Sequence, residues 1–206
     1  MPHLVIVAGP NGSGKTTLVR SGVIARALGQ TFEAINADDI AKSLAGDQQP
    51  TDWQSLRAAQ MADARLDAAI ASGASVLIET VLSSDKFKPR VEAAKKAFFT
   101  FTLIYVTVRQ AALNVARVDH RGRRGGHPVP PDRVIARRGR SHAMFAWFAR
   151  EADTVLVFDN SDAVPHLVAF RGRDGWAQIN PERLPADLAR VIEQLSCEQP
   201  SHPPSD

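Results

Sequence analysis

The sequence predicts a single α/β domain in which a parallel sheet is covered by helices on both faces. Three observations lead to this fold class. Apolar runs of strand length alternate with longer segments whose apolar residues recur every three or four positions. The apolar runs are continuous, as in strands that are buried on both faces. The chain has 206 residues, which is enough for one sizeable core and too short for two ordinary domains.

The first half of the chain supplies three strands and the helices that connect them. The strands are predicted over His3–Ala8, Phe32–Ala37 and Ser75–Thr80. Helices are predicted over residues 15–28, 40–45 and 52–72. The last of these has a clear amphipathic pattern and ends at Gly73, a residue that commonly follows a helix.

The second half of the chain completes the sheet. Strands are predicted over residues 99–108 and Thr154–Asn160, with an edge hairpin that turns over Gly172–Gly175. Helices are predicted over residues 85–97, 110–121, 131–150 and 184–195. We expect five parallel strands in the order 2-3-1-4-5, with right-handed crossovers and the hairpin appended. The domain is predicted to occupy residues 1–195, and the Pro- and Ser-rich segment 196–206 is predicted to be a disordered tail.

A glycine-rich loop follows the first strand and carries the chemistry of the site. The stretch GPNGSGKTT matches the Walker A pattern G-x-x-x-x-G-K-[ST], with a buried strand before it and a helix after it. Glycines allow successive N–H groups to point at one anion, and the helix that follows adds its positive end. The residues predicted to bind a nucleoside triphosphate here are Gly9, Pro10, Asn11, Gly12, Ser13, Gly14, Lys15, Thr16 and Thr17.

The loop defines the fold class as a P-loop NTPase with three α/β/α layers. Lys15 supplies a cation for the β and γ phosphates, and the Thr16 hydroxyl is placed to bind Mg²⁺. The guanine-reading sequence N-K-x-D of switch GTPases is absent, and large mechanical ATPases need a longer chain. A small-molecule kinase remains. It needs an acidic group for the acceptor hydroxyl, cations around the transferred phosphoryl group and a cover against water.

Acidic and hydroxyl residues follow the second and third strands, at the sheet edge where ligands bind in this architecture. Asp38 and Asp39 follow the second strand. They are candidates to activate an acceptor hydroxyl, but either can instead cap the next helix. Glu79 ends the third strand, where it can hold Mg²⁺ through water, bind the acceptor or remain a solvated carboxylate. Thr80 extends the predicted acceptor site.

Arginines are concentrated between residues 117 and 140, which hold eight of them around a loop at Gly125–Asp132. Arginines four positions apart on one helix face repel each other, and a bound polyphosphate would relieve that repulsion. We therefore predict an arginine-rich lid over 117–140. A solvated basic face and an RNA-binding strip are the alternatives. Arg117 and Arg121 are four positions apart on one predicted helix face, as are Arg133 and Arg137 on the next.

The end of the fifth strand is predicted to form the nucleotide-base side of the site. Asp159 ends that strand in the manner of a Walker B aspartate, but it lies far downstream of the loop. Asp159, Asn160 and Ser161 are therefore interpreted as base-side or structural groups, and Asn160 is assigned to nucleotide binding.

Composition narrows the setting of the protein. Charged residues make up 23% of the chain, and the net charge is +3. One cysteine excludes an internal disulfide framework, and no apolar run is long enough to span a bilayer, so we expect a cytoplasmic protein without a membrane partner. Aromatic residues do not interleave with the arginines. Stacking platforms for nucleic acid are thus missing, and nucleic acid is not an expected partner.

The order of these motifs resembles the zeta toxin family. GPNGSGKTT, INADDI and VLIET are followed by R-V-x-x-R, GGHPVP and R-x-x-R-S, over about Leu4–Phe170. The resemblance implies transfer of phosphate from ATP, with Mg²⁺, to a hydroxyl of a UDP-N-acetyl sugar. It also implies Asp38 as the base, Glu79 in the acceptor site and an antitoxin protein as a possible partner. The lid arginines that the resemblance assigns to catalysis are Arg117, Arg121, Arg137 and Arg140. A nucleotide-gated RNA-binding ATPase and a housekeeping kinase with another acceptor are the alternative functions.

Overall fold

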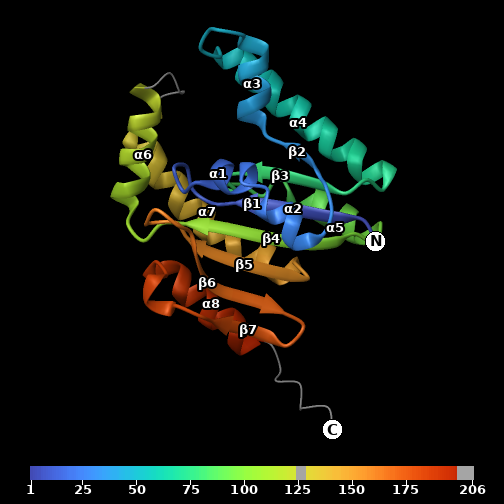
Figure 1. Cartoon of the computed structure of the whole chain (residues 1–206), viewed down its shortest axis with the longest axis vertical. Coiled ribbons are helices and arrows are strands. Elements are labelled where there is room, and N and C mark those ends of the chain that lie inside the picture. Colours follow the sequence, from blue (N-terminus) through green and yellow to red (C-terminus); the bar gives the residue numbers. More distant parts are fainter. Residues whose placement is uncertain (124–128, 199–206) are drawn as a thin grey trace.

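The computed structural model describes residues 1–123 and 129–198, and a seven-stranded sheet forms its centre (Figure 1). The strand order is β2-β3-β1-β4-β5-β6-β7. The strands are β1 His3–Ala8, β2 Glu33–Ile35, β3 Val76–Thr80, β4 Thr100–Thr107, β5 Thr154–Asp159, β6 His166–Gly172 and β7 Gly175–Gln178. The first five are parallel in the predicted order, which confirms the fold class.

The sheet is wider than the predicted five strands because the hairpin joins it directly. β6 pairs antiparallel with β5, with Leu156 opposite Phe170, and β7 pairs antiparallel with β6 through Gly172 and Gly175. The hairpin itself lies where the sequence predicted it. It adds two antiparallel strands beside β5, a common feature of otherwise parallel sheets.

Helices occupy most of the predicted positions. They are α1 Lys15–Arg20, α2 Val23–Leu28, α3 Ala37–Ala45, α4 Asp52–Ser72, α5 Lys88–Lys96, α6 Ala111–Arg123, α7 Pro131–Glu151 and α8 Ala186–Glu198, with a 3₁₀ helix η1 at Pro181–Arg183. The single helix predicted over 15–28 is wrong, because the chain breaks it at Ser21 and Gly22. Glycine is the poorest helix former after proline, which explains the position of the break.

The C-terminal helix extends further than the sequence suggested. α8 runs to Glu198, so the prediction that the tail begins at Ser196 is wrong for its first three residues. Leu195 is buried on this helix, and Arg150 of α7 forms an ion pair of 2.8 Å with Glu198. These contacts hold the last turn against α7. The remainder of the predicted tail lies outside the described residues.

Two apolar cores separate the layers of the domain. Leu4, Ile6 and Ala8 of β1 face the larger core, which α4, α5, α7 and α8 cover. Val5 and Val7 point to the opposite face, where α1 and α2 supply Leu18 and Ile24. Side chains of a strand alternate between the two faces, so a strand that is apolar throughout needs helices on both sides. No helix in the described part of the chain has the apolar length that crossing a bilayer requires.

A polar cluster joins β4, α7 and α8 behind the sheet edge, in which Thr107 and His142 are buried and Asp187 is exposed. His142 of α7 lies 2.5 Å from Asp187 of α8 through Nδ1 and 3.3 Å from the Thr107 hydroxyl through Nε2. Burial lowers the pKa of His142 below its ordinary value, although Asp187 acts in the opposite direction. We infer that neutral His142 donates from Nδ1 to the Asp187 carboxylate and accepts from Thr107 at Nε2.

This cluster predicts that acid destabilises the fold. The pKa of His142 is lower in the folded chain than the ordinary value of 6.5 that applies in the unfolded chain. Below pH 6.5 the unfolded chain therefore binds a proton at His142 more readily than the folded chain does. The free energy of unfolding is therefore expected to fall as the pH drops from about 7 to about 5. Urea unfolding across this range measures the slope. Replacing His142 with glutamine is expected to flatten it, and an unchanged slope in that variant would assign the effect elsewhere.

Candidate active site

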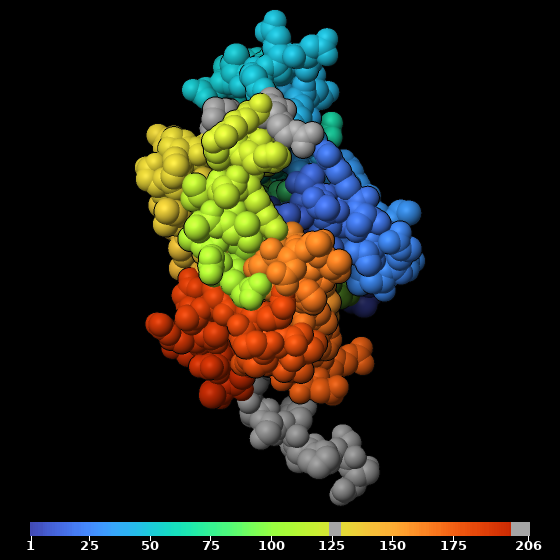
Figure 2. Space-filling model, turned by 60° about the vertical axis from the view of Figure 1, so that its left-hand side comes forward, coloured from blue at the N-terminus to red at the C-terminus, as the bar shows by residue number. Residues whose placement is uncertain are grey.

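A cleft of about 610 Å³ opens at the carboxyl edge of the parallel strands. Figure 2 shows the surface hollowed between α6, the N-terminal segment and the segment that follows β5. The cleft brings together many of the residues predicted from the sequence, namely Asn11, Gly12, Gly14, Lys15, Thr16, Thr17, Asp38, Glu79, Thr80, Arg117, Arg121 and Asn160. Gly9, Pro10 and Ser13 belong to the same loop but do not line the cleft.

The glycine-rich loop connects β1 to α1 and is packed tightly against its surroundings. Gly14 has a φ of 96°, which side-chain-bearing residues rarely adopt. A Cβ atom at Gly14 would lie 2.0 Å from Nδ2 of Asn160. Both observations explain why this position must be glycine.

Lys15 is a buried cation at the floor of the cleft. Its side chain is 7% exposed, and Nζ donates to the carbonyl oxygen of Pro10 at 3.1 Å. Burial lowers the pKa of Lys15, while Glu79 and Asp38 act to raise it. A lysine ammonium has three donors, and a neutral carbonyl is its one hydrogen-bond partner among the described residues. This arrangement fits a polyanion such as a triphosphate in the cleft.

Thr16 and Glu79 meet at the place where the sequence predicts Mg²⁺. The Thr16 hydroxyl donates to Oε1 of Glu79 at 2.6 Å, and Nδ2 of Asn36 donates to Oε2 at 2.7 Å. The parallel pairing of β1 with β3 places Glu79 opposite Val7, near the end of β1. The glycine-rich loop follows β1 directly and leads to Thr16 in α1, so Thr16 comes close to Glu79. A hydroxyl beside a carboxylate is a suitable oxygen donor set for Mg²⁺, which retains several water and phosphate ligands. No group of three or more His, Cys, Asp or Glu side chains that could hold a metal ion occurs among the described residues.

Asp38 lies in the first turn of α3 and lines the cleft. The predicted alternative, that Asp38 or Asp39 caps this helix, is wrong: Asn36 is the cap, and its Oδ1 accepts from the backbone N–H of Asp38 at 2.8 Å. Asp39 instead pairs with Arg20 at 2.8 Å. The Asp38 carboxylate has no hydrogen bond or ion pair within residues 1–123 and 129–198. It is thus the acidic group available to an acceptor.

The predicted lid arginines occupy three different environments. Arg117 and Arg121 of α6 line the cleft. Arg137 of α7 lines a neighbouring cleft of about 590 Å³, which shares Asp38 and Arg121 with the first. Arg140 is exposed and lines neither cleft. The structure therefore assembles Arg117 and Arg121 with the loop, places Arg137 next to it and leaves Arg140 apart. Residues 124–128 of the predicted lid lie outside the described residues.

Arg117 also has a structural role. Its Nη1 donates to the carbonyl oxygen of Asn160 at 2.7 Å, and Nη2 donates to that of Ser161 at 3.4 Å. Nδ2 of Asn160 in turn donates to the carbonyl oxygen of Ser13 at 2.7 Å. Asn160 therefore links the segment after β5 to the glycine-rich loop. These contacts close one wall of the cleft.

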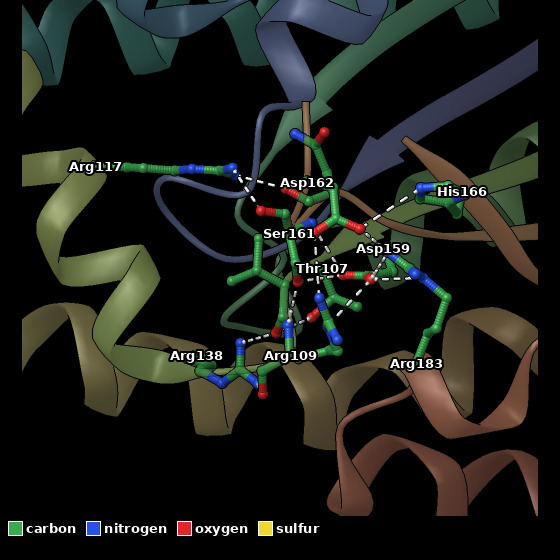
Figure 3. Close-up of polar contacts among 11 residues, drawn as sticks. Thr107, Arg109, Arg117, Arg138, Asp159, Ser161, Asp162, His166 and Arg183 are labelled. Carbon is green, nitrogen blue, oxygen red and sulfur yellow. Dashed lines mark hydrogen bonds and ion pairs between the residues drawn. The ribbon is translucent and has the colours of Figure 1, made fainter. Parts of the chain in front are cut away.

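Asp159 is fully buried and anchors this wall from below (Figure 3). Ser161 donates to it through its backbone N–H at 3.0 Å, and Arg183 donates through Nε at 3.0 Å. Arg109 lies 3.5 Å away and also pairs with Asp162. Asp162 lines the cleft, and a hydrogen bond from Arg183 lowers the pKa of its carboxyl group. Of the roles predicted for Asp159, these contacts support the structural one.

Sequence reasoning missed Asn36, Asn114 and Arg138. Asn36 precedes the predicted aspartate pair, and its position directly after β2 could have suggested a cap. Arg138 belongs to the predicted lid over residues 117–140, yet it is only 7% exposed. The position of Arg138 along the helix could have indicated its burial, because it lies four residues after Val134, three before Ser141 and seven before Phe145, in the pattern that forms the buried face of α7. For Asn114 no motif gives a signal.

Known structures share this fold. A chain in the structure of AvrRxo1-ORF1:-ORF2 with ATP is 18% identical, with a TM-score of 0.67, and the match covers 95% of this chain and 64% of that one. A chain of the PezAT chromosomal toxin–antitoxin system of Streptococcus pneumoniae is 14% identical, with a TM-score of 0.65, and the match covers 98% and 80%. At such identities the likeness concerns the fold, and at that level it agrees with the predicted resemblance to zeta toxins.

A third structure with this fold is a chain of the Pnkp1/Rnl/Hen1 RNA repair complex. It is 21% identical, with a TM-score of 0.55, over 69% of this chain and 45% of that one. No curated protein matches the sequence. The model of the AAA domain family matches residues 4–144, which include the glycine-rich loop, Asp38, Glu79 and the arginines of α6. Because this match spans more than half of the sequence, the chain belongs to the AAA domain family.

Proposed function

We propose that this protein is a phosphotransferase that moves the γ-phosphate of ATP to a hydroxyl group of a small acceptor. One observation carries the proposal. A single cleft of about 610 Å³ contains the buried cation Lys15, the free carboxylate Asp38 and two arginines of α6. A site that only binds nucleotide has no need of an unpaired carboxylate beside the phosphate loop, because that charge repels the ligand.

Each side chain has a role in this reaction. Asp38 accepts the proton of the acceptor hydroxyl as its oxygen bonds to the γ-phosphorus. The bond from phosphorus to the β–γ bridging oxygen breaks, and ADP leaves. Lys15 and Arg121 stabilise the negative charge on the transferred group. Thr16 and Glu79 would hold Mg²⁺, which neutralises charge on the phosphates when it is bound.

The acceptor that we propose is a UDP-N-acetyl sugar. The resemblance to zeta toxins supports this class, as does a second cleft that adjoins Asp38. Its lining holds four cations, Lys42, Arg121, Arg133 and Arg137, against three carboxylates, Asp38, Asp47 and Asp52. Cations there suit an acceptor that brings its own phosphates. We further propose an antitoxin protein as partner, since similar folds occur in a toxin–antitoxin system. A cytoplasmic location fits this substrate class.

Mass spectrometry of acceptor mixtures tests the proposed function. Incubation with ATP and Mg²⁺ is expected to add one phosphoryl group to UDP-N-acetylglucosamine or a close relative, with equal release of ADP. A panel of nucleotide sugars, free sugars and short RNA oligonucleotides separates the acceptor classes. Phosphorylation of RNA alone would replace the proposed acceptor. Slow ATP hydrolysis with no phosphorylated acceptor would contradict a phosphotransferase.

A further inference from the structure

Three carbonyl groups of the glycine-rich loop each accept a hydrogen bond from a side chain. Lys15 donates to the carbonyl oxygen of Pro10 at 3.1 Å, Asn114 to that of Asn11 at 2.7 Å, and Asn160 to that of Ser13 at 2.7 Å. Each peptide unit is planar and trans, with its C=O and N–H pointing in opposite directions. A donor that fixes the carbonyl of Asn11 therefore also fixes the direction of the next N–H, that of Gly12.

Asn114 is well placed for this task. It is fully buried on α6, and its backbone packs on the loop so closely that a Cβ at Gly12 would lie 2.7 Å from the Asn114 carbonyl oxygen. Gly12 lines the cleft next to Lys15. The loop conformation and the position of α6 are thus coupled at this contact.

Arg138 of α7 fixes the orientation of the Asn114 amide. Its Nη1 donates to Oδ1 of Asn114 at 2.9 Å and to the carbonyl oxygen of Val108 at 2.8 Å. A guanidinium has donors only, so the oxygen of Asn114 must face Arg138. The NH₂ group must then face Asn11. The direction of the Asn114 hydrogen bond to the loop follows from the chemistry of Arg138.

Arg138 is an unusual residue for a purely structural role. Its three hydrogen bonds reach neutral oxygens, and no carboxylate lies within ion-pair distance of it in the described residues. Burial lowers the pKa of Arg138, and the negative charge of Asp187 is the main influence that raises it. A buried cation without a paired anion destabilises a fold. A polyanion bound at the nearby loop would offset that cost.

We propose that Asn114 and Arg138 are positioning residues that set the direction of the loop N–H groups for nucleotide binding. The inference rests on the proposed binding of ATP, and it does not depend on the acceptor. Arg137, which lines the second cleft, directly precedes Arg138 on α7. The same helix therefore carries a residue that orients the phosphate loop and a residue that faces the second cleft.

Two variants and one matched control test the inference. Asn114→Ala removes the donor to Asn11, and Arg138→Lys keeps the charge but loses the fork of donors. The control is Arg171→Lys on β6, because Arg171 is also buried and donates to a backbone carbonyl, that of Ala152, away from the cleft. Calorimetric titration with ATP and Mg²⁺ gives the dissociation constant, and thermal melting without ligand gives stability.

Asn114→Ala and Arg138→Lys are each expected to raise the dissociation constant of ATP about tenfold, the size of one lost buried hydrogen bond. Arg171→Lys is expected to lower the melting temperature with no change in ATP affinity. Equal ATP affinity in all variants, or an equal loss in the control, would overturn the inference. If the native chain binds ATP but phosphorylates no acceptor, the proposed function fails and the inference stands. If it does not bind ATP, both fail.

If Asn114→Ala does not fold, the milder variant Asn114→Ser replaces it, and Arg138→Gln replaces Arg138→Lys if that variant does not fold. Amide exchange of these variants gives a readout that needs no ligand, because the backbone N–H of Ser13 donates to the carbonyl oxygen of Pro10 at 3.2 Å and is protected while the loop keeps its conformation. Faster exchange of the Ser13 N–H than in the native chain, with unchanged exchange in the strands, is the expected result. The native exchange rate at Ser13 in either variant would overturn the assignment of the residue that it replaces.

Discussion

Replacing Asp38 with asparagine is expected to lower phosphoryl transfer by about 10²–10⁴ while ATP still binds. Asp38 is the carboxylate of the cleft that has no hydrogen bond or ion pair among the described residues, whereas both oxygens of Glu79 accept hydrogen bonds. Asparagine keeps the shape of the side chain and cannot accept a proton. Single-turnover transfer with ATP and Mg²⁺, compared with the ATP dissociation constant, separates the chemical step from binding.

Asp39 provides the control on the same helical turn. Its carboxylate pairs with exposed Arg20 rather than facing the cleft, so Asp39→Asn is expected to transfer phosphate at the native rate. Both variants remove one negative charge from the first turn of α3, and the cap at Asn36 remains in both. Equal activity of the two variants, at either level, would show that Asp38 is not the base.

The sequence was sufficient for the parts of the site that depend on local pattern. Gly14, Lys15 and Thr16 could be placed in one cleft because each has a reason to occupy a fixed place in one short loop. Glu79 could be placed at the same edge because parallel strands end together, and the register of β1 with β3 bears this out. Both inferences require only one loop and one sheet, without knowledge of how helices pack.

The arginines show where such reasoning stops. Arg137 and Arg138 are adjacent in sequence and chemically identical, yet Arg137 lines a cleft and Arg138 is buried behind the loop. Their difference depends on the rotation of α7 against β4 and α6, which is set by packing. Arg140 is also on α7 but lines neither cleft. A count of cations therefore predicts that phosphate is nearby without identifying which side chains meet it.

Replacing Lys15 with methionine is expected to have opposite effects on activity and on stability. The ammonium is buried, and burial lowers its pKa, so the charged form is disfavoured in the free protein. Methionine fills similar space without the charge, so it removes the cost of burying an ammonium group that has no ion pair among the described residues. The melting temperature without ligand is therefore expected to stay level or rise. Transfer is expected to fall about 10²–10³, because a cation that stabilises the transferred group is lost.

Melting curves with and without ATP and Mg²⁺ measure both effects in one experiment. The native chain is expected to melt later when ATP is added, because a ligand that binds only the folded state stabilises it. Lys15→Met is expected to lose most of that gain. Lys15→Arg is the matched control: it keeps the charge but presents a planar group to the Pro10 carbonyl and the cleft. A methionine variant that melts earlier than the native chain and keeps the full gain from ATP would mean that Lys15 supports the fold and not the phosphate. Native behaviour of Lys15→Arg would show that the charge matters and its geometry does not.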